Sequence, residues 1–207
     1  QAVDRSQWEV WFACDERYRN FVAQAELPWR PLPSLAPEVF RQRLSAGAPL
    51  FDRQTLEREV ADDEALLDEL RPDLVVGDFR VSLGISALKA EVPYANLCNA
   101  HWSPHSTLPF PAPELPFLRH LGSALAGPLV RLSTPAVFHL HARAFNALRR
   151  RHGLPQVRGI REMYTLGNWT LFADLPQLAP VSGLPVSHRY LGPVIWAPDE
   201  PLPPGLL

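Results

Sequence analysis

The fold of this chain is most constrained by a short apolar segment, residues 74–79 (LVVGDF), in which apolar and polar residues do not alternate. A strand with one face in water alternates with a period of two, so this segment is typical of a strand buried on both faces. Such strands occur mainly in parallel sheets that are covered by helices. The segment therefore predicts an α/β protein built on a parallel sheet.

Helical and strand patterns alternate around this segment. Asp52 can cap a helix that ends near Leu70, and Ser82 can cap a second helix over residues 83–91. Residues 93–100 (PYANLCNA) then predict another strand. Because helix, buried strand, helix and strand follow one another, we expect a Rossmann-like, doubly wound parallel sheet with helices on both faces.

The other patterns fit the same sheet. The long helix has an apolar stripe that includes Leu56 and Val60, and Asp63 is expected off that stripe. No repeat or composition break divides the chain, so residues 1–192 are expected to form one domain. The remaining predicted elements are strands at 9–14, 29–32, 169–173 and 188–196, and helices at 15–25, 118–132, 136–152 and 160–166.

Proline is the unusual component, with 23 of 207 residues, about twice the usual ~5%. Five prolines lie within 104–116, where they are expected to shape a loop beside the sheet, and five lie within 193–204. We interpret residues 193–207 as a proline-rich linker that leads to another domain.

Charge and cysteine content exclude several classes of function. The 20 basic and 22 acidic residues give a net charge of −2, without the basic surplus that nucleic-acid binding usually requires. No apolar stretch reaches the roughly 18 residues of a membrane-spanning helix. Cys14 and Cys98 are isolated in apolar segments, which favours buried thiols and a reducing cytoplasm over a disulfide framework.

Asp78 is the first candidate for a functional residue. Ligands of open α/β sheets bind outside the carboxyl ends of the strands, and Asp78 lies at such an end. A carboxylate there is costly to desolvate unless it is paired, and it can orient a histidine that acts as a base. The alternative is that Asp78 only caps the next helix together with Ser82.

The loop after the next predicted strand, residues 99–105 (NAHWSPH), is the second candidate. His101, Trp102 and His105 can line a binding pocket at the same edge of the sheet, although they can equally be surface loop residues. Pro104 separates the two histidines, so a metal-binding pair on one helical face is not expected. Phosphate-loop, dinucleotide-binding, nucleophile-elbow and zinc motifs are absent from the sequence, and we expect neither a metal nor a cofactor.

Three segments in order resemble the GT-B glycosyltransferases. Residues 71–79 (RPDLVVGDF) with 91–94 (EVPY) are similar to the acceptor-binding, amino-terminal domains of UDP-glycosyltransferases and of macrolide or antibiotic glycosyltransferases. Residues 8–13 (WEVWFA) resemble the second strand of that domain, and residues 190–196 (YLGPVIW) resemble the segment that leads to its interdomain linker. The matches extend over nearly the whole chain.

The resemblance implies that a sugar is transferred from a nucleotide sugar, as co-substrate, to a hydroxyl of a small hydrophobic acceptor. Asp78 matches the aspartate that supports the histidine base, and that base is expected in a loop upstream of residue 1. His105 is the substitute base if this branch departs from the pattern. The first strand and the donor-binding domain after Leu207 are expected elsewhere, which makes the chain a fragment unless another segment fills the gap in the sheet.

Two other functions remain open at this point. The same scaffold could serve a sugar-nucleotide epimerase, which needs no acceptor and is distinguished by its products. A non-catalytic helper or binding protein of the same fold is the other alternative. A histidine in the upstream loop would favour catalysis over that role.

Overall fold

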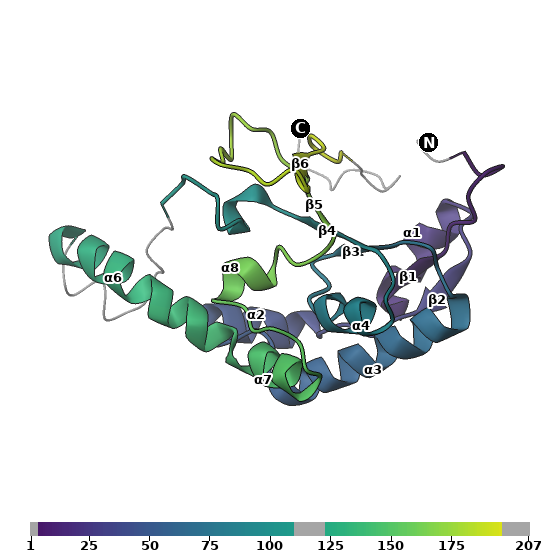
Figure 1. Ribbon diagram of the computed structural model, residues 1–207, viewed down its shortest axis with the longest axis horizontal. Coiled ribbons are helices and arrows are strands. Elements are labelled where there is room, and N and C mark those ends of the chain that lie inside the picture. The colour runs from purple at the N-terminus through teal and green to yellow at the C-terminus, as the bar shows by residue number, and fades with distance from the viewer. Residues whose placement is uncertain (1–3, 110–122, 196–207) are drawn as a thin grey trace, which may run out of the picture. The chain divides into compact units, whose positions relative to one another are not determined.

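The structure is a computed structural model that describes residues 4–109 and 123–195 (Figure 1). The described residues before Leu35, with Val194 and Ile195, form one compact unit, and Leu35–Pro193 form a second. The prolines at 111–116 and 198–204 and the predicted start of a helix at 118 lie outside the described residues. The boundary between domain and linker at residue 192 stays a prediction.

The first unit contains two short parallel strands. β1 (Phe12–Cys14) and β2 (Trp29–Pro31) pair in register from Phe12 opposite Trp29 onward. A 3-10 helix, η1 (Glu16–Tyr18), and α1 (Arg19–Gln24) connect them. The Asp15 carboxylate accepts a hydrogen bond from the backbone N–H of Arg17 at 3.2 Å and so caps η1.

The second unit contains a four-stranded, wholly parallel sheet in the order β3-β4-β5-β6. Asp78 is opposite Leu97, and Cys98 is opposite Phe172, so the carboxyl ends of neighbouring strands lie at one edge. This arrangement confirms the predicted α/β fold. The strands are β3 (Val75–Asp78), β4 (Tyr94–Cys98), β5 (Trp169–Phe172) and β6 (His188–Tyr190).

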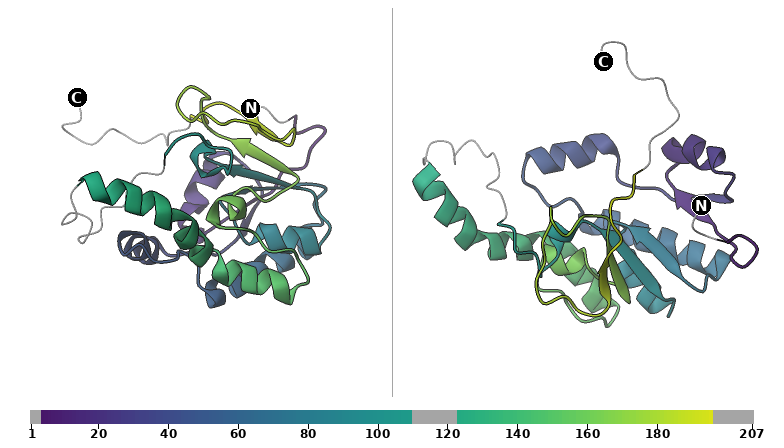
Figure 2. Two further views of the ribbon diagram at one scale, coloured as in Figure 1. Left: turned by 60° about the vertical axis from the view of Figure 1, so that its left-hand side comes forward. Right: turned by 90° about the horizontal axis from the view of Figure 1, so that it is seen from above.

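Several helices share one core on the same side of this sheet (Figures 1 and 2). Leu56 of α3, Ile85 of α4 and Phe145 of α7 are completely buried in that core. None of the helices among residues 4–109 and 123–195 is long and apolar enough to cross a membrane. The helices are α2 (Pro37–Ser45), α3 (Arg53–Leu70), α4 (Leu83–Lys89), η2 (Ala100–Trp102), α6 (Ser123–His141), α7 (Arg143–Arg151) and α8 (Ile160–Met163).

Two helices differ from the sequence prediction. α2 was not predicted, and none of its residues is buried. α6 continues through Pro135, where a break was expected, and the chain turns at Ala142 instead. Pro135 is exposed, so water can reach the backbone carbonyl that loses its partner.

Ser82 does not cap α4, which corrects the second cap prediction. Its own backbone is already helical, with φ −59° and ψ −31°, and its side chain makes no capping hydrogen bond. A capping residue needs an extended backbone for its hydroxyl to reach the next N–H groups. The alternative reading of Asp78, as part of a cap with Ser82, therefore loses its partner.

A buried charge cluster joins α3 to the segment after β3. Asp63, expected off the apolar stripe, is 2% exposed, and its Oδ1 lies 3.0 Å from Arg80 Nε. Glu59 Oε1 lies 3.7 Å from Arg80 Nη1, and Ser86 Oγ donates to Asp63 Oδ2 at 3.1 Å. Burial raises the pKa of Glu59 to about 6, because the charge of Arg80 offsets only part of the lost hydration.

Replacing Glu59 with glutamine tests this cluster. The pKa of Glu59 is raised above its unfolded value of 4.5, so the folded protein holds the proton more tightly and loses stability as pH rises from about 4.5 to 6. The Glu59→Gln variant should gain stability relative to wild type by about 1 kcal/mol more at pH 7.5 than at pH 5. Urea unfolding at both pH values measures the difference, and a difference that does not change with pH would contradict the assignment.

Gly77 is required by close packing in β3. A Cβ at this position would lie 2.5 Å from Leu83 Cδ1 and 3.1 Å from the Tyr94 ring, and both side chains are buried. We expect Gly77→Ala to lower the free energy of unfolding by about 1–3 kcal/mol. Gly127→Ala in α6 is the control and should leave stability unchanged or slightly higher, because among the described residues outside the helix's own backbone no atom lies within 4 Å of the added carbon. Equal effects of the two changes in chemical denaturation would refute the packing argument.

Candidate functional site

The carboxyl edge of the second unit's sheet gathers most of the predicted site residues. β3 ends at Asp78, β4 leads into η2, and β5 ends at Phe172. Phe79, directly after Asp78, has a φ of 49°, a left-handed conformation that is unfavourable for an aromatic residue. Backbone strain of this kind is concentrated at ligand-binding and catalytic sites.

Asp78 lies at this edge as expected, with an exposed side chain. Loss of hydration raises the pKa of its carboxyl group, and no opposing partner is found for it among residues 4–109 and 123–195. An unpaired carboxylate at a strand end is available to a ligand or to a residue outside the described segments. Its predicted role as an orienting carboxylate stays a prediction.

His101 and Trp102 belong to an aromatic group that we call the edge cluster: Phe79, His101, Trp102 and Tyr164. The rings of His101 and Trp102 have centroids 5.0 Å apart, and Trp102 meets Tyr164 edge to face at the same distance. Tyr164 also meets Phe79 at 5.5 Å. Both His101 and Trp102 are half-buried, so the cluster combines packed rings with surface that a ligand can reach.

The charges around His101 oppose one another. Burial is the largest influence and lowers the pKa of His101 below 6.5, the negative charge of Asp174 raises it, and the positive charge of Arg161 lowers it. The imidazole is therefore neutral at pH 7 and can accept a proton.

His105 lies apart from the edge cluster, in contact with other rings. Its ring meets His188 of β6 edge to face at 5.9 Å, and His188 meets Phe172 at the same distance. The backbone N–H of His105 donates to Ser103 Oγ at 3.1 Å. The structure thus places His101 with Trp102, and His105 with His188.

Two residues of the edge were missed by the sequence reasoning. Asp174 follows β5 by two residues and accepts a hydrogen bond from Asn99 Nδ2 at 3.2 Å. The rule that selected Asp78, a carboxylate just after a strand, also fits Asp174 and could have found it. Tyr164 follows α8, and no local pattern marks it as a neighbour of Trp102.

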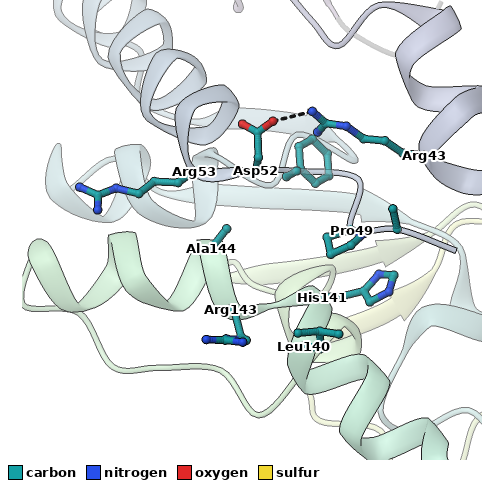
Figure 3. Close-up of a pocket in the computed structure, with 10 residues that line it drawn as sticks. Arg43, Pro49, Asp52, Arg53, Leu140, His141, Arg143 and Ala144 are labelled. Atoms are coloured by element: carbon teal, nitrogen blue, oxygen red, sulfur yellow. Dashed lines mark hydrogen bonds and ion pairs between the residues drawn. The ribbon is translucent and has the colours of Figure 1, made fainter. Parts of the chain in front are cut away.

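A separate hollow of about 460 Å³ lies between the α2–α3 turn and the junction of α6 and α7 (Figure 3). Its apolar wall includes Pro49 and Leu140, and Arg43 pairs with Asp52 at its rim. The pKa of His141, which also lines it, is lowered by burial. The hollow suits an apolar group, and none of the predicted site residues lines it.

Another hollow, of about 570 Å³, is lined by Trp169, Val186, Ser187 and Arg189, where β5 and β6 begin. It is therefore at the amino ends of the strands, away from the edge cluster. No group of three histidine, cysteine or acidic side chains that could hold a metal ion is found within the described ranges.

Comparison with known proteins identifies relatives by sequence. No family model matches the chain. An "Inactive PGL/p-HBAD biosynthesis glycosyltransferase" of Mycobacterium bovis BCG is 39% identical over 200 residues, which are 96% of this chain and 55% of that protein. A PGL/p-HBAD biosynthesis glycosyltransferase of Mycobacterium tuberculosis is also 39% identical over 96% of this chain and 47% of its own length. A rhamnosyltransferase of the same biosynthesis, from Mycobacterium bovis BCG, is 40% identical over 199 residues, 96% of this chain and 44% of that protein. Over nearly its whole length, the chain is therefore similar to part of several proteins named as glycosyltransferases.

Solved structures of glycosyltransferases share the fold. The kitacinnamycin glycosyltransferase aligns with a TM-score of 0.58 at 17% identity, over 94% of this chain and 46% of that one. CalG4, the calicheamicin glycosyltransferase, aligns with a TM-score of 0.56 at 16% identity, over 95% of this chain and 48% of that one. These likenesses confirm the predicted fold class, and the sequence relatives confirm the resemblance noted in the sequence.

This similarity does not by itself establish that the protein transfers a sugar. The chain spans about half the length of the relatives it matches. One of those relatives is named inactive, so a related sequence can lack catalytic activity.

The protonation of His101 provides a direct check on the geometry of the edge cluster. The imidazole should titrate with a pKa below 6.5, because its burial outweighs the charge of Asp174. Histidine carbon NMR over pH 4.5–8.5, assigned with a His101→Gln variant, measures the value. A pKa above 6.5 would show that His101 is more exposed, or closer to a carboxylate, than this structure has it.

Proposed function

We propose that the protein containing this chain transfers a sugar from a nucleotide sugar to a hydroxyl of a small acceptor, and that the carboxyl edge of the second unit binds that acceptor. The observation that carries the proposal is 39–40% identity over 96% of the chain to proteins named as glycosyltransferases and a rhamnosyltransferase. The exposed parts of the edge cluster support the proposed position of the acceptor.

The reaction requires a proton acceptor and a positioned hydroxyl. A base removes the proton, the acceptor oxygen attacks the anomeric carbon, and the bond between that carbon and the nucleoside diphosphate breaks as the diphosphate leaves. Holding the hydroxyl beside the anomeric carbon supplies much of the acceleration. We expect neither a metal nor a cofactor in this step.

We assign roles to the four predicted residues on their positions. Asp78 orients the base that removes the proton. His101 and Trp102 line the acceptor pocket, where the neutral imidazole can hydrogen-bond the hydroxyl and the indole can cover an apolar body. His105 is the substitute base, and its contact with His188 gives it the less favourable position.

The proposal extends to the acceptor, the donor site and the cellular compartment. A hydrophobic acceptor is favoured because the side chains of the edge cluster are mainly aromatic. The nucleotide sugar is expected to bind residues outside this chain. Both cysteines are free, in keeping with the proposed reducing cytoplasm.

A non-catalytic helper is the second candidate function. It is favoured by the name of the M. bovis relative, which is called inactive although it is 39% identical over 96% of this chain. Such a protein would keep the fold and bind a partner enzyme or an acceptor without transferring a sugar.

Substitution of Asp78 distinguishes the catalytic proposal from its alternatives. In the full-length protein, Asp78→Asn should lower kcat/KM for sugar transfer about 10²-fold or more, because an amide supports a charged base poorly. Mass spectrometry of acceptor products from a panel of nucleotide sugars measures transfer. Asp73→Asn, an exposed carboxylate just before β3, is the control and should retain normal turnover.

Near-normal turnover of Asp78→Asn would remove Asp78 from the mechanism. A wild-type protein that binds acceptors yet transfers no sugar from any donor would favour the helper function. A sugar isomer formed without an acceptor would indicate an epimerase.

A further inference from the structure

We propose that Asp174 is the positioning residue of the acceptor site: its carboxylate fixes the turn that carries His101 and Trp102, and its charge acts on the His101 ring. The inference rests on the proposed function, which assigns acceptor binding to this site. The contacts themselves are independent of that function.

Strand pairing brings Asp174 to this turn. Cys98, the last residue of β4, is opposite Phe172, the last residue of β5. The backbone N–H of Ala173 donates to the Cys98 carbonyl at 3.2 Å, which extends the pairing by one residue. Asp174 is therefore next to the first residues beyond β4, although 74 positions separate it from Ala100 along the chain.

Both carboxylate oxygens of Asp174 hold the start of the turn. Oδ2 accepts the backbone N–H of Ala100, and Oδ1 accepts Asn99 Nδ2 at 3.2 Å. Ala100 is completely buried and begins η2, where backbone N–H groups have no partner within the helix. Asn99 occupies the capping position but makes no capping bond with its own side chain. Asp174 thus supplies the cap from a different strand.

The same carboxylate acts on His101, the second residue of η2. Among the residues that the structure describes, two charges act on this imidazole: that of Asp174, after β5, raises its pKa, and that of Arg161 of α8 lowers it. The neighbouring Tyr164, which follows α8, is neutral at ordinary pH, because burial raises its pKa to about 12. Asp174 is the negative partner that offsets Arg161 and part of the effect of burial on His101.

Asp78 and Asp174 differ in their contacts with the turn that carries His101. Both carboxylates act electrostatically on the buried Cys98 thiol, whose pKa burial raises to about 12, so the two flank the end of β4. Asp174 acts on His101 and bonds to its turn, whereas no bond from Asp78 to that turn is found within the described ranges. The carboxylate coupled to His101 is therefore the one after β5.

Two variants separate the charge of Asp174 from its hydrogen bonds. Asp174→Asn removes the charge but keeps an oxygen that can accept the Ala100 N–H, whereas Asp174→Ala removes both. Asp73→Asn is the control, because Asp73 is exposed and lies at the opposite ends of the strands.

The first measurement is the pKa of His101 in the full-length protein by histidine carbon NMR. Asp174→Asn should lower this pKa, since a negative charge near the ring is lost, and Asp73→Asn should leave it unchanged. Thermal unfolding of each variant confirms that the fold is intact. A His101 pKa that is the same in Asp174→Asn and wild type overturns the proposal.

The second measurement is the pH profile of kcat/KM for the acceptor. The kcat/KM of Asp174→Ala should be about 10- to 100-fold lower than that of wild type, as for other residues that orient functional side chains. Asp174→Asn should recover most of that loss at pH 8 and shift the acidic limb of the profile to lower pH. Turnover of Asp174→Ala equal to that of Asp73→Asn would contradict a positioning role.

The two measurements also separate this inference from the proposed function. If the wild-type protein transfers no sugar but Asp174→Asn lowers the His101 pKa, the proposed function fails and the coupling of Asp174 to His101 stands. If transfer is observed and neither the pKa nor the profile responds to Asp174, the inference fails and the proposed function stands.

Discussion

The functional proposals all depend on the pairing of β4 with a parallel strand on each side. Because Asp78 is opposite Leu97 and Cys98 is opposite Phe172, β3, β4 and β5 end within one residue of a common level. Parallel pairing directs the carboxyl ends of all these strands to one edge. A slip of one residue in either pairing would turn buried side chains to the opposite face and separate Asp174 from the turn after β4.

Packing around this sheet keeps the edge in place. The Arg80 guanidinium follows β3 and is enclosed by Asp63 and Glu59 of α3, which connects the long helix to the strand through buried charge. Burying such a cluster contributes little net stability, but removal of one partner is costly, so it favours a single arrangement of helix and strand. Phe79 and Trp102 of the edge cluster pack directly on the core that these helices share.

The sequence predicted the elements but only part of the site, and the reason is physical. The apolar segment before Asp78 and the cap at Asp52 are local signals, and the parallel strand and the cap are both confirmed. The expected burial of that strand on both faces was wrong, because β3 lies at the edge of its sheet and Leu74 and Val76 are exposed. Asp63 was misplaced because its partner Arg80 lies 17 residues away, and periodicity does not show which charge is paired. Asp174 and Tyr164 join the loop at 99–102 only through the register of β4 and β5 and the packing of α8, which no local pattern reports.

The central claim is that the acceptor binds at the carboxyl edge, beside His101 and Trp102. A crystal structure of the full-length protein with an accepted acceptor bound tests this claim most directly. The account predicts the reacting hydroxyl within hydrogen-bonding distance of the His101 ring and the body of the acceptor against Trp102. An acceptor bound instead in the hollow lined by Pro49, Leu140 and His141, with the edge cluster empty, would contradict it.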